Sequence, residues 1–403
     1  MKRRALAHIA DLHINERRRP EDTSGVLAEF VEAAGVAGVD LIVVSGDFFH
    51  RKSSPVERLM LADFLEAATA VAPVFGVRGN HDAPGDLALF DRLHPRVTIA
   101  ERPGPAVVYD HTPGTRFACV GLPWFDKASC VARTGSRSAA DSNELAMAGA
   151  ASVLEGVAAE VAWASGQGMI PVLVGHVLVA GSTTSTGQTL VGTTVELGPA
   201  ALAETGAEYV ALGHVHKRQG FMAGPGNHDG RVHYSGSPER HNFGEDEPKG
   251  WNLVEFNGRD LAGVEFVELE SARAIALLDA DWTAEAGAEF SVYPAPPFDR
   301  GALVRFRYRI EPDKLGEVDE AAIRERYLAA GAQSVTFEAV LAHRERIRSD
   351  EIATARTTFE KIEAYWAATG VKVDVPTRVR VKQKLVELER AGELEGVGLH
   401  ATA

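Results

Sequence analysis

Five short motifs in the first 216 residues combine carboxylates, imidazoles and one amide. They are Asp11-Leu12-His13, Gly46-Asp47-Phe48-Phe49-His50, Gly79-Asn80-His81-Asp82, Gly175-His176 and Gly213-His214-Val215-His216. Taken singly, each has a plain explanation, because Gly, Asn and Asp favour turns. Together they offer nitrogen and oxygen donors without a thiolate, a set that suits manganese, iron or zinc better than calcium or copper(I). Two such cations ~3.5–4 Å apart can share a carboxylate and a water, and can neutralise charge growing on a phosphoryl group.

Each motif directly follows an apolar run that predicts a β-strand. The runs are Ala5 to Ala10, Asp40 to Ser45, Pro73 to Val77, Ile170 to Gly175 and Glu208 to Leu212, with another at Arg116 to Leu122. Helical patterns lie between many of them, at Val26 to Ala37, Val56 to Val71 and Asn143 to Ala164. This alternation is typical of layered α/β proteins, which place their sites at the carboxyl ends of strands. We therefore expect the five motifs at one rim, with Asp47 bridging the two cations.

The remaining chain predicts a change of architecture. Three consecutive strands, Arg231 to Ser235, Trp251 to Phe256 and Gly263 to Leu269, are expected to form antiparallel hairpins. A proline-bearing connection, Glu285 to Arg300, precedes a strand, helix, strand unit at Ala302 to Ile310, Glu320 to Ala330 and Ser334 to Leu341. Two helices follow, Ile352 to Ala368 and Arg378 to Arg390, which Pro376 is expected to separate.

Length and composition fit a globular protein of two or three domains. The chain has 403 residues, of which 45% are hydrophobic and 24% charged, and its formal net charge is −14. That charge argues against a nucleic-acid partner at first, since a polyanion is expected to meet a basic surface. Residues 300–390, however, hold 18 basic and 15 acidic side chains, and bound cations add positive charge. The balance therefore predicts weak, salt-sensitive binding of nucleic acid rather than none.

Cysteine usage and hydropathy point to a cytoplasmic protein. Cys119 and Cys130 are too far apart for a metal-binding or redox pair and are expected to be reduced thiols. The longest late apolar stretch, Met169 to Ala180, is interrupted by His176 and falls short of the roughly 20 residues that a bilayer requires. We expect neither a membrane span nor export.

The five motifs resemble the calcineurin-like metallophosphoesterase superfamily, and further segments resemble its SbcD-like branch of DNA double-strand-break repair nucleases. These segments are His176 to Gly181, Tyr209 to Gln219, Tyr234 to Arg240, Gly244-Glu245 and Lys249-Gly250. The resemblance implies an α/β fold, a four-layer sandwich of two mixed sheets flanked by helices, with a small α/β capping domain and C-terminal helices. It implies a nuclease domain at 1–270, a capping and DNA-binding domain at 285–345, and an ATPase-binding helical segment at 346–403.

The resemblance also implies a role for each motif residue. One cation would be held by Asp11, His13, Asp47 and His216, and the other by Asp47, Asn80, His176 and His214. The metal is expected to be manganese, with magnesium, iron or zinc as alternatives. His81 would face the scissile phosphate and Asp82 would orient a loop or an imidazole. His50 would bind the phosphodiester or position the strand; the alternative is a loop residue packed on Phe48 or Phe49.

Several residues are candidates for contacts with DNA. Arg78 departs from the family, which usually has a small residue before Gly-Asn-His, and it could grip a phosphate or point to solvent. Arg240 lies in the Gly-Ser-Pro-Glu-Arg segment. Arg305, Arg307 and Arg309 alternate with apolar residues, so they form either a phosphate-contacting row or a solvated strand face. The Ser-, Thr- and Gly-rich loop from Gly181 to Gly192 would border the substrate cleft. A second Gly-Asn-His-Asp, at 226–229, predicts a turn.

These implications predict a two-metal phosphodiester hydrolase: a DNA exonuclease or endonuclease acting on DNA ends in double-strand-break repair or recombination. The expected partners are DNA, an SbcC-type ABC ATPase with coiled coils, and a second copy of the chain. Two alternatives remain, a phosphoesterase acting on a cyclic nucleotide or a phosphoprotein, and a catalytically silent scaffold that binds DNA ends. A small substrate would not require a capping domain and partner-binding helices, whereas the filled ligand positions and His81 oppose the silent scaffold.

Overall fold

A computed structural model describes residues 3–112, 115–125, 139–188, 195–221, 230–283, 298–342 and 350–390. Cys130, the second Gly-Asn-His-Asp and most of the predicted proline-bearing connection lie outside these residues. The chain divides into two compact units, and the first of them comprises Met1–Ala280, Glu289–Tyr308 and Asp319–Glu338. The second comprises Asp281–Ala288, Arg309–Val318 and Ala339–Ala403.

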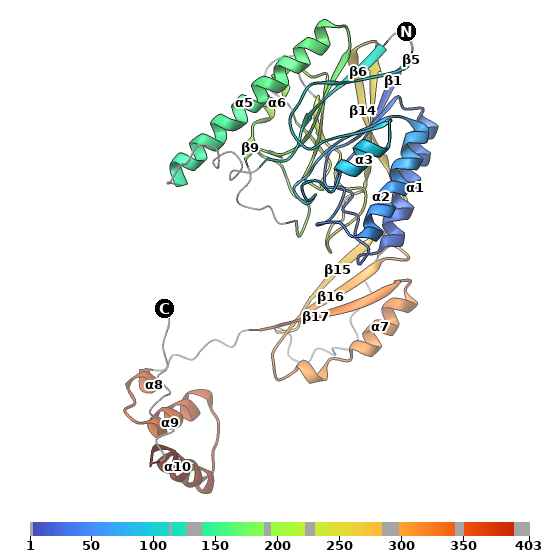
Figure 1. The fold of residues 1–403 in the computed structure, drawn as a ribbon. Coiled ribbons are helices and arrows are strands. Elements are labelled where there is room, and N and C mark those ends of the chain that lie inside the picture. The colour runs from blue at the N-terminus through green and yellow to red at the C-terminus, as the bar shows by residue number, and fades with distance from the viewer. Residues whose placement is uncertain are drawn as a thin grey trace. The chain divides into compact units, whose positions relative to one another are not determined.

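Two six-stranded mixed sheets form the centre of the first unit (Figure 1). The first sheet has the order β14-β13-β1-β2-β3-β4. Its strands are β1 (Arg4–Ile9), β2 (Leu41–Val44), β3 (Val74–Val77), β4 (Val97–Ala100), β13 (Gly250–Asn257) and β14 (Asp260–Glu268). The second sheet has the order β11-β12-β10-β7-β6-β5. Its strands are β5 (Val107–Thr112), β6 (Thr115–Leu122), β7 (Ile170–His176), β10 (Tyr209–Gly213), β11 (Gln219–Phe221) and β12 (Val232–Tyr234).

Helices cover the outer face of each sheet. The helices α1 (Pro20–Ala37), α2 (Pro55–Val71) and α3 (Ala88–Leu93) belong to the first sheet, and α5 (Ala139–Gly166) and α6 (Pro199–Ala203) to the second. The facing sheet surfaces share one core, which contains Leu6, Val43, Val172 and Tyr209. Their strand neighbours alternate to the outer faces, as the pleat requires, and pack against the helices. The layer order is helix, sheet, sheet, helix, so the predicted four-layer α/β sandwich is confirmed.

The pairing of one predicted strand differs from the expectation. β12 does not form a hairpin with β13; it pairs in parallel with β10 and antiparallel with β11 in the second sheet. β13 and β14 do form the predicted hairpin, and β13 lies antiparallel to β1 in the first sheet. The chain therefore crosses between sheets after Tyr234, and the crossing segment passes the rim where the motifs lie.

One described helix is apolar enough and long enough to cross a membrane by length and composition, the part of α5 from Glu144 to Gly166. A core helix of a water-soluble protein passes the same test. One face of α5 carries Ala146, Ala150, Val157 and Val161 into the core beneath the second sheet.

Beyond β14 a three-stranded sheet has the order β15-β16-β17 and carries α7 (Glu320–Ala329). Its strands are β15 (Ile275–Asp281), β16 (Leu303–Ile310) and β17 (Ser334–Leu341). The strand, helix, strand unit is as predicted, but β15 was not expected. Val304, Phe306 and Tyr308 of β16 are buried against Ile323 and Tyr327 of α7. The intervening arginines consequently alternate to the other face.

The C-terminal helices differ from the prediction in their bounds, although α10 ends at Arg390 as predicted. They are α8 (Asp350–Thr354), α9 (Thr358–Thr369) and α10 (Val375–Arg390). The single helix expected from Ile352 is interrupted because Thr357 and Glu360 form a capping box that starts α9. Pro376 does not separate two helices; it lies in the first turn of α10, where its missing N–H costs no hydrogen bond.

Candidate metal centre

The structure brings the five motifs together at one rim of the sandwich. In the first sheet, Asp11 and His13 follow β1, Asp47 and His50 follow β2, and Asn80 and His81 follow β3. In the second sheet, His176 ends β7, and His214 and His216 follow β10. The strands within each of these groups run parallel, so their carboxyl ends share one edge. The two edges are joined directly, because the backbone N–H of His214 donates to Asp11 Oδ1 at 3.0 Å.

A cavity of about 220 Å³ opens over this rim. Seven of the predicted site residues line it, namely His13, Asp47, His50, Asn80, His81, His214 and His216. Asp11 and His176 have exposed fractions of 0% and lie beneath it.

The donor atoms fall into two groups that share Asp47. In one group, the Nε2 atoms of His13 and His216 lie 3.0 Å apart, and His13 Nε2 lies 3.6 Å from Asp47 Oδ2. In the other, His176 Nε2 lies 3.4 Å from the same Asp47 Oδ2 and 3.0 Å from Asn80 Oδ1. His214 Nδ1 also lies 3.0 Å from Asn80 Oδ1. Asp47 is thus the side chain positioned between both groups.

The chemistry of these donors fits two divalent cations. Burial lowers the pKa of His13 well below its ordinary value and lowers those of His214 and His216 to about 3. The three imidazoles are therefore neutral at physiological pH, which is the form that binds metal. In each group a pair of donors lies 3.0 Å apart, His13 Nε2 with His216 Nε2 and His214 Nδ1 with Asn80 Oδ1, and a cation in that group would use their lone pairs.

Charge is concentrated on Asp47 and His176. Burial opposes ionisation of Asp47, but the neighbouring His176 outweighs it and holds the pKa of this carboxyl well below its usual range. Burial likewise opposes protonation of His176, yet the Asp47 and Asp11 carboxylates raise its pKa to about 9. His176 Nδ1–H donates to the Ser45 carbonyl at 2.7 Å, which leaves Nε2 for a ligand. A cation at Nε2 must displace a proton, so metal affinity at this residue rises with pH.

The backbone at the rim is strained. Asp11, His13, Asp47 and His214 have φ angles of 55°, 46°, 52° and 105°, in or near the left-handed region that L residues seldom adopt. Each such residue costs on the order of 1–3 kcal/mol. Gly79 leaves room for the Asp47 carboxylate, because a Cβ at this position would lie 2.0 Å from Asp47 Oδ1.

Two further imidazoles stand at the mouth of the cavity. The rings of His50 and His81 stack with their centroids 5.4 Å apart, and the His50 ring also meets His13 edge to face. His81 Nδ1–H donates to the His50 carbonyl at 2.7 Å, and its backbone N–H donates to Asp47 Oδ1 at 2.9 Å. Phe48 and Phe49, the alternative packing partners of His50, are fully buried in the core beneath the first sheet.

Asp82 is buried behind the rim. Its carboxylate accepts hydrogen bonds from the backbone N–H groups of Phe48, Phe49 and Gly79 at 3.3, 2.9 and 2.9 Å. Burial, followed by the charge of Asp47, raises the pKa of Asp82 to about 7. The side chain therefore ties the Asp47 loop to the Gly79 turn, in keeping with the orienting role that the resemblance implied.

Two predicted DNA contacts are engaged inside the protein. The guanidinium of Arg78 donates to the carbonyls of Trp124 and Gly79 at 3.0 and 3.3 Å. That of Arg240 donates to the carbonyls of Glu245 and Ala272 at 3.0 and 2.8 Å. These contacts favour structural roles over phosphate binding.

The arginines of β16 lie elsewhere. Arg305 and Arg307 line a second cavity of about 260 Å³ that shares Arg18, Gly187, His241 and Asn242 with the first. Arg305 lies 4.1 Å above the Phe243 ring and 3.6 Å from Glu338, and Arg307 pairs with Asp279. All these residues belong to the first compact unit. Arg309 is exposed and lies in the second.

The sequence analysis missed three residues at the site, Gln188, Trp124 and Arg18, and gave His241 only as a candidate to approach DNA beside the Gly-Ser-Pro-Glu-Arg segment. Gln188 donates from Nε2 to the His214 carbonyl at 2.6 Å and accepts from the His216 N–H at 3.2 Å, so it clamps this ligand segment. The Trp124 ring lies 4.9 Å from that of His214. Arg18 lines both cavities, and His241 packs its ring 4.8 Å from His13. Of the three missed residues, only Gln188 carried a sequence signal, its place in the loop expected to border the cleft.

Comparison with curated proteins supports the repair-nuclease resemblance. The DNA double-strand break repair protein Mre11 of Methanopyrus kandleri is 25% identical over an alignment 429 positions long, which covers 97% of this chain and 85% of that protein. Mre11 of Archaeoglobus fulgidus is 36% identical over 86 residues, 19% of either chain. Among solved structures, purple acid phosphatase PPD1 from yellow lupin (Lupinus luteus) aligns with a TM-score of 0.39 and 12% identity, covering 68% of this chain and 52% of that one.

The family is settled by a sequence profile. The profile of the calcineurin-like phosphoesterases matches residues 5–218, which is more than half of the chain and includes every motif residue of the rim. The chain therefore belongs to the calcineurin-like phosphoesterase family, whose members are hydrolases with a two-metal centre.

Proposed function

We propose that this chain is a manganese-dependent DNA nuclease that hydrolyses phosphodiesters at DNA ends during double-strand-break repair or recombination. The observation that carries the proposal is that two cavities adjoin. The cavity over the donor set shares Arg18, Gly187, His241 and Asn242 with the cavity that Arg305 and Arg307 line. A polymeric phosphodiester would occupy both, whereas a cyclic nucleotide or a phosphoserine would require only the first. The similarity to Mre11 along almost the whole chain supports the same conclusion.

In this proposal the chain's residues hold the two cations, orient His81 and protonate the leaving oxygen. Asp11, His13, Asp47 and His216 would hold one cation, and Asp47, Asn80, His176 and His214 the other. When bound, the two cations lower the pKa of a shared water and offset charge on the phosphoryl oxygens. His81 is held through Nδ1 by the His50 carbonyl, so its Nε2 is available to the substrate. A proton at Nε2 can pass to the departing deoxyribose oxygen, and the stacked His50 ring holds His81 in place.

The test is an assay of the full chain, alone and with its ATPase, with manganese or magnesium. The substrates are linear duplex DNA, single-stranded DNA, a cyclic nucleotide and a phosphopeptide. We expect nucleotide release from DNA and at most slow turnover of the others. Turnover of the small esters alone would favour the phosphoesterase alternative. DNA-end binding without hydrolysis under any condition would favour the silent scaffold.

Arg18 offers a sharper test of DNA as the substrate. Its exposed guanidinium is held by the His241 carbonyl at 3.1 Å where the two cavities meet. Arg18→Ala is expected to raise the KM for DNA about three- to tenfold and to lower the salt dependence of binding by roughly one phosphate contact. Hydrolysis of bis(4-nitrophenyl) phosphate should change much less. Arg17→Ala removes the same charge from an exposed neighbour that lines neither cavity, and equal effects of both variants would contradict the assignment.

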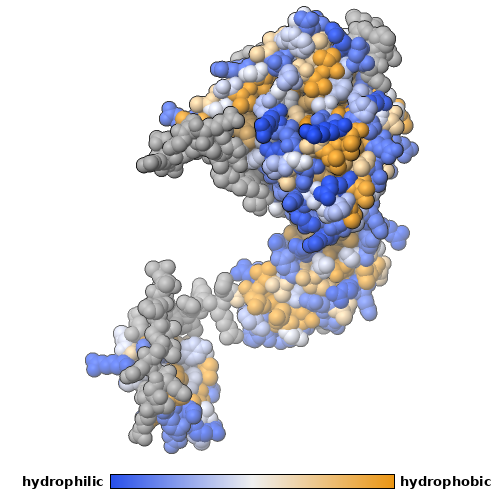
Figure 2. All heavy atoms as spheres, viewed as in Figure 1, coloured by the Kyte–Doolittle hydropathy of each residue, from blue (hydrophilic) through white to orange (hydrophobic). Residues whose placement is uncertain are grey.

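Two surfaces support the proposed protein partners. α2 and α3 expose Leu59, Leu89 and Leu93 by 66%, 52% and 73% around a groove of about 580 Å³, and Figure 2 shows hydrophobic side chains gathered over these helices. We assign this surface to a second copy of the chain. α9 and α10 expose Tyr365, Val375 and Val379 by 53%, 73% and 49%. We assign these helices to an SbcC-type ABC ATPase, in a complex that acts on DNA in the cytoplasm.

A further inference from the structure

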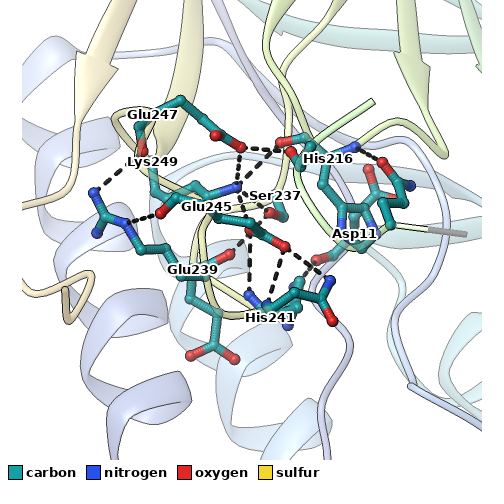
Figure 3. A network of polar contacts seen from close by, with 12 residues as sticks. Asp11, His216, Ser237, Glu239, His241, Glu245, Glu247 and Lys249 are labelled. Atoms are coloured by element: carbon teal, nitrogen blue, oxygen red, sulfur yellow. Dashed lines mark hydrogen bonds and ion pairs between the residues drawn. The ribbon is translucent and has the colours of Figure 1, made fainter. Parts of the chain in front are cut away.

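A buried ion pair lies in the segment that crosses between the sheets, residues 235–249, here termed the crossing loop (Figure 3). Lys249 Nζ lies 2.7 Å from Glu245 Oε2 and 2.9 Å from Glu247 Oε1. The side chains of Lys249 and Glu245 are exposed by only 1% and 0%. Lysine and glutamate are seldom buried to this degree. Both belong to the Gly-Glu and Lys-Gly motifs of the sequence, to which the proposed mechanism gives no role.

Glu245 fixes the turn that carries His241. Its carboxylate accepts from the backbone N–H groups of His241 and Asn242 at 3.3 and 3.0 Å, and from Asn242 Nδ2 at 2.9 Å. His241 Nε2–H in turn donates to the Asp11 carbonyl at 3.4 Å. The carboxylate thus holds an imidazole over the backbone of a candidate ligand.

Lys249 fixes the segment that carries His216. Besides its two carboxylate partners, Nζ donates to Ser237 Oγ at 3.2 Å and to the His216 carbonyl at 3.4 Å. The same carbonyl accepts from the Ser237 N–H at 3.0 Å, while Gln188 holds the N–H of His216 on its other side. Figure 3 shows Lys249 and Glu245 lying between Ser237, His216 and the turn at His241.

The two anchored imidazoles meet His13. The ring of His216 lies 4.9 Å from that of His13 and 5.0 Å from that of His241, and His241 lies 4.8 Å from His13. The ion pair is therefore connected to one donor group, that of His13 and His216. Among the described residues, the hydrogen bonds and ion pairs of Glu245 and Lys249 do not include the side chains of His176 and His214 in the other group.

A contribution to folding stability does not by itself explain why this ion pair is buried here. A buried ion pair can often be replaced by uncharged residues at no loss of stability, whereas removal of one partner leaves a costly unpaired charge. A geometric role for the pair accounts for its position.

We propose that Glu245 and Lys249 are a positioning pair that holds His216 and His241 in the geometry required for the cation at Asp11 and His13. This inference rests on the proposed two-metal function and concerns one of its two cation sites. Loss of the pair is expected to weaken that site and to leave the site of Asn80, His176 and His214 nearly intact. Residues that orient metal ligands typically contribute ten- to hundredfold to metal affinity.

The test compares Lys249→Met, Glu245→Gln and the double variant with the wild-type chain. Thermal unfolding measures stability, and titration with manganese alone, followed by calorimetry and electron paramagnetic resonance, measures the two affinities and the magnetic coupling of the manganese pair. We expect Lys249→Met to unfold at a lower temperature and the double variant to recover much of that loss. The double variant should still bind one manganese ion at least about tenfold more weakly and lose the coupled signal at equimolar loading.

Glu245→Gln keeps the size and one acceptor oxygen of the side chain and provides the folded variant if the others fail to fold. It is expected to weaken the same site by several-fold. Arg4→Met with Asp40→Asn is the matched control, because this pair is also buried, at 4% and 12% exposure, and lies at the opposite end of β1. It should lower stability without changing either manganese affinity.

The outcomes separate this inference from the proposed function. Any folded variant of the pair with both wild-type affinities and the coupled signal overturns the positioning role. Equal weakening of both sites also overturns it, because the pair would then act on the fold as a whole. A wild-type chain that binds two manganese ions but does not cut DNA instead refutes the nuclease and leaves the positioning role supported by the metal titrations.

Discussion

Asp47→Ala is expected to abolish binding of both cations and to lower hydrolysis of DNA by at least about 10⁴-fold. The reason is geometric: Asp47 Oδ2 lies within 3.6 Å of His13 and 3.4 Å of His176, one from each donor group. The same carboxylate accepts the backbone N–H of His81, so the substitution also frees the proposed acid. Manganese stoichiometry by calorimetry and nucleotide release from labelled DNA measure the two effects.

The control for Asp47 is Asp63→Ala, which removes an exposed carboxylate from α2. It should retain two manganese ions and full activity. If Asp47→Ala kept one tightly bound ion and partial activity, Asp47 would serve a single cation and another ligand would have to join the two groups.

His81→Ala is expected to lower kcat on DNA about 10²- to 10⁴-fold while both manganese ions remain bound. His81 lines the cavity and contacts His50, His13 and the Asp47 carboxylate. The Asn80 oxygen of the second donor group is instead contacted by His176 and His214. The deoxyribose oxygen is a poor leaving group and benefits from a proton. The loss should therefore be much smaller on bis(4-nitrophenyl) phosphate, whose leaving group departs readily without one.

The prediction is tested by measuring manganese stoichiometry and kcat on DNA and on bis(4-nitrophenyl) phosphate. Arg17→Ala provides the control, because Arg17 is exposed and lines neither cavity. If His81→Ala lost a manganese ion together with activity, His81 would be a ligand. An equal loss on both substrates would indicate stabilisation of phosphoryl charge in place of proton transfer.

The rim could be predicted from the sequence because each of its motifs directly follows the apolar run that forms the preceding strand. Asp11, Asp47 and Asn80 each follow an apolar run, and parallel strands must end at a common edge. The helix α2 is likewise local: Ser54 and Glu57 form a capping box just before an apolar pattern. The sequence signals for these elements lie within short stretches of the chain, which is why the four-layer sandwich could be inferred.

Other features depend on partners far along the chain. The Arg78 guanidinium donates a hydrogen bond to the Trp124 carbonyl, 46 residues away in sequence, so the residues next to Arg78 gave no indication of its role. β15 was missed because its pairing partner β16 begins after a long intervening connection and its own residues alternate poorly. β12 has a clear strand pattern, but a strand pattern does not indicate which neighbouring strand it pairs with, here β10 of the second sheet. Arg18 and His241 reach the cavity only through tertiary contacts.

The left-handed backbone at Asp11, His13, Asp47 and His214 has a consequence for attempts to improve this protein in the laboratory. Glycine adopts such angles without strain, so selection for thermal tolerance of the metal-free chain would reward glycine at these four positions. Every such gain would delete a proposed metal ligand. The most heat-resistant descendants would then be the least active, and a library screened for stability should hold these codons fixed.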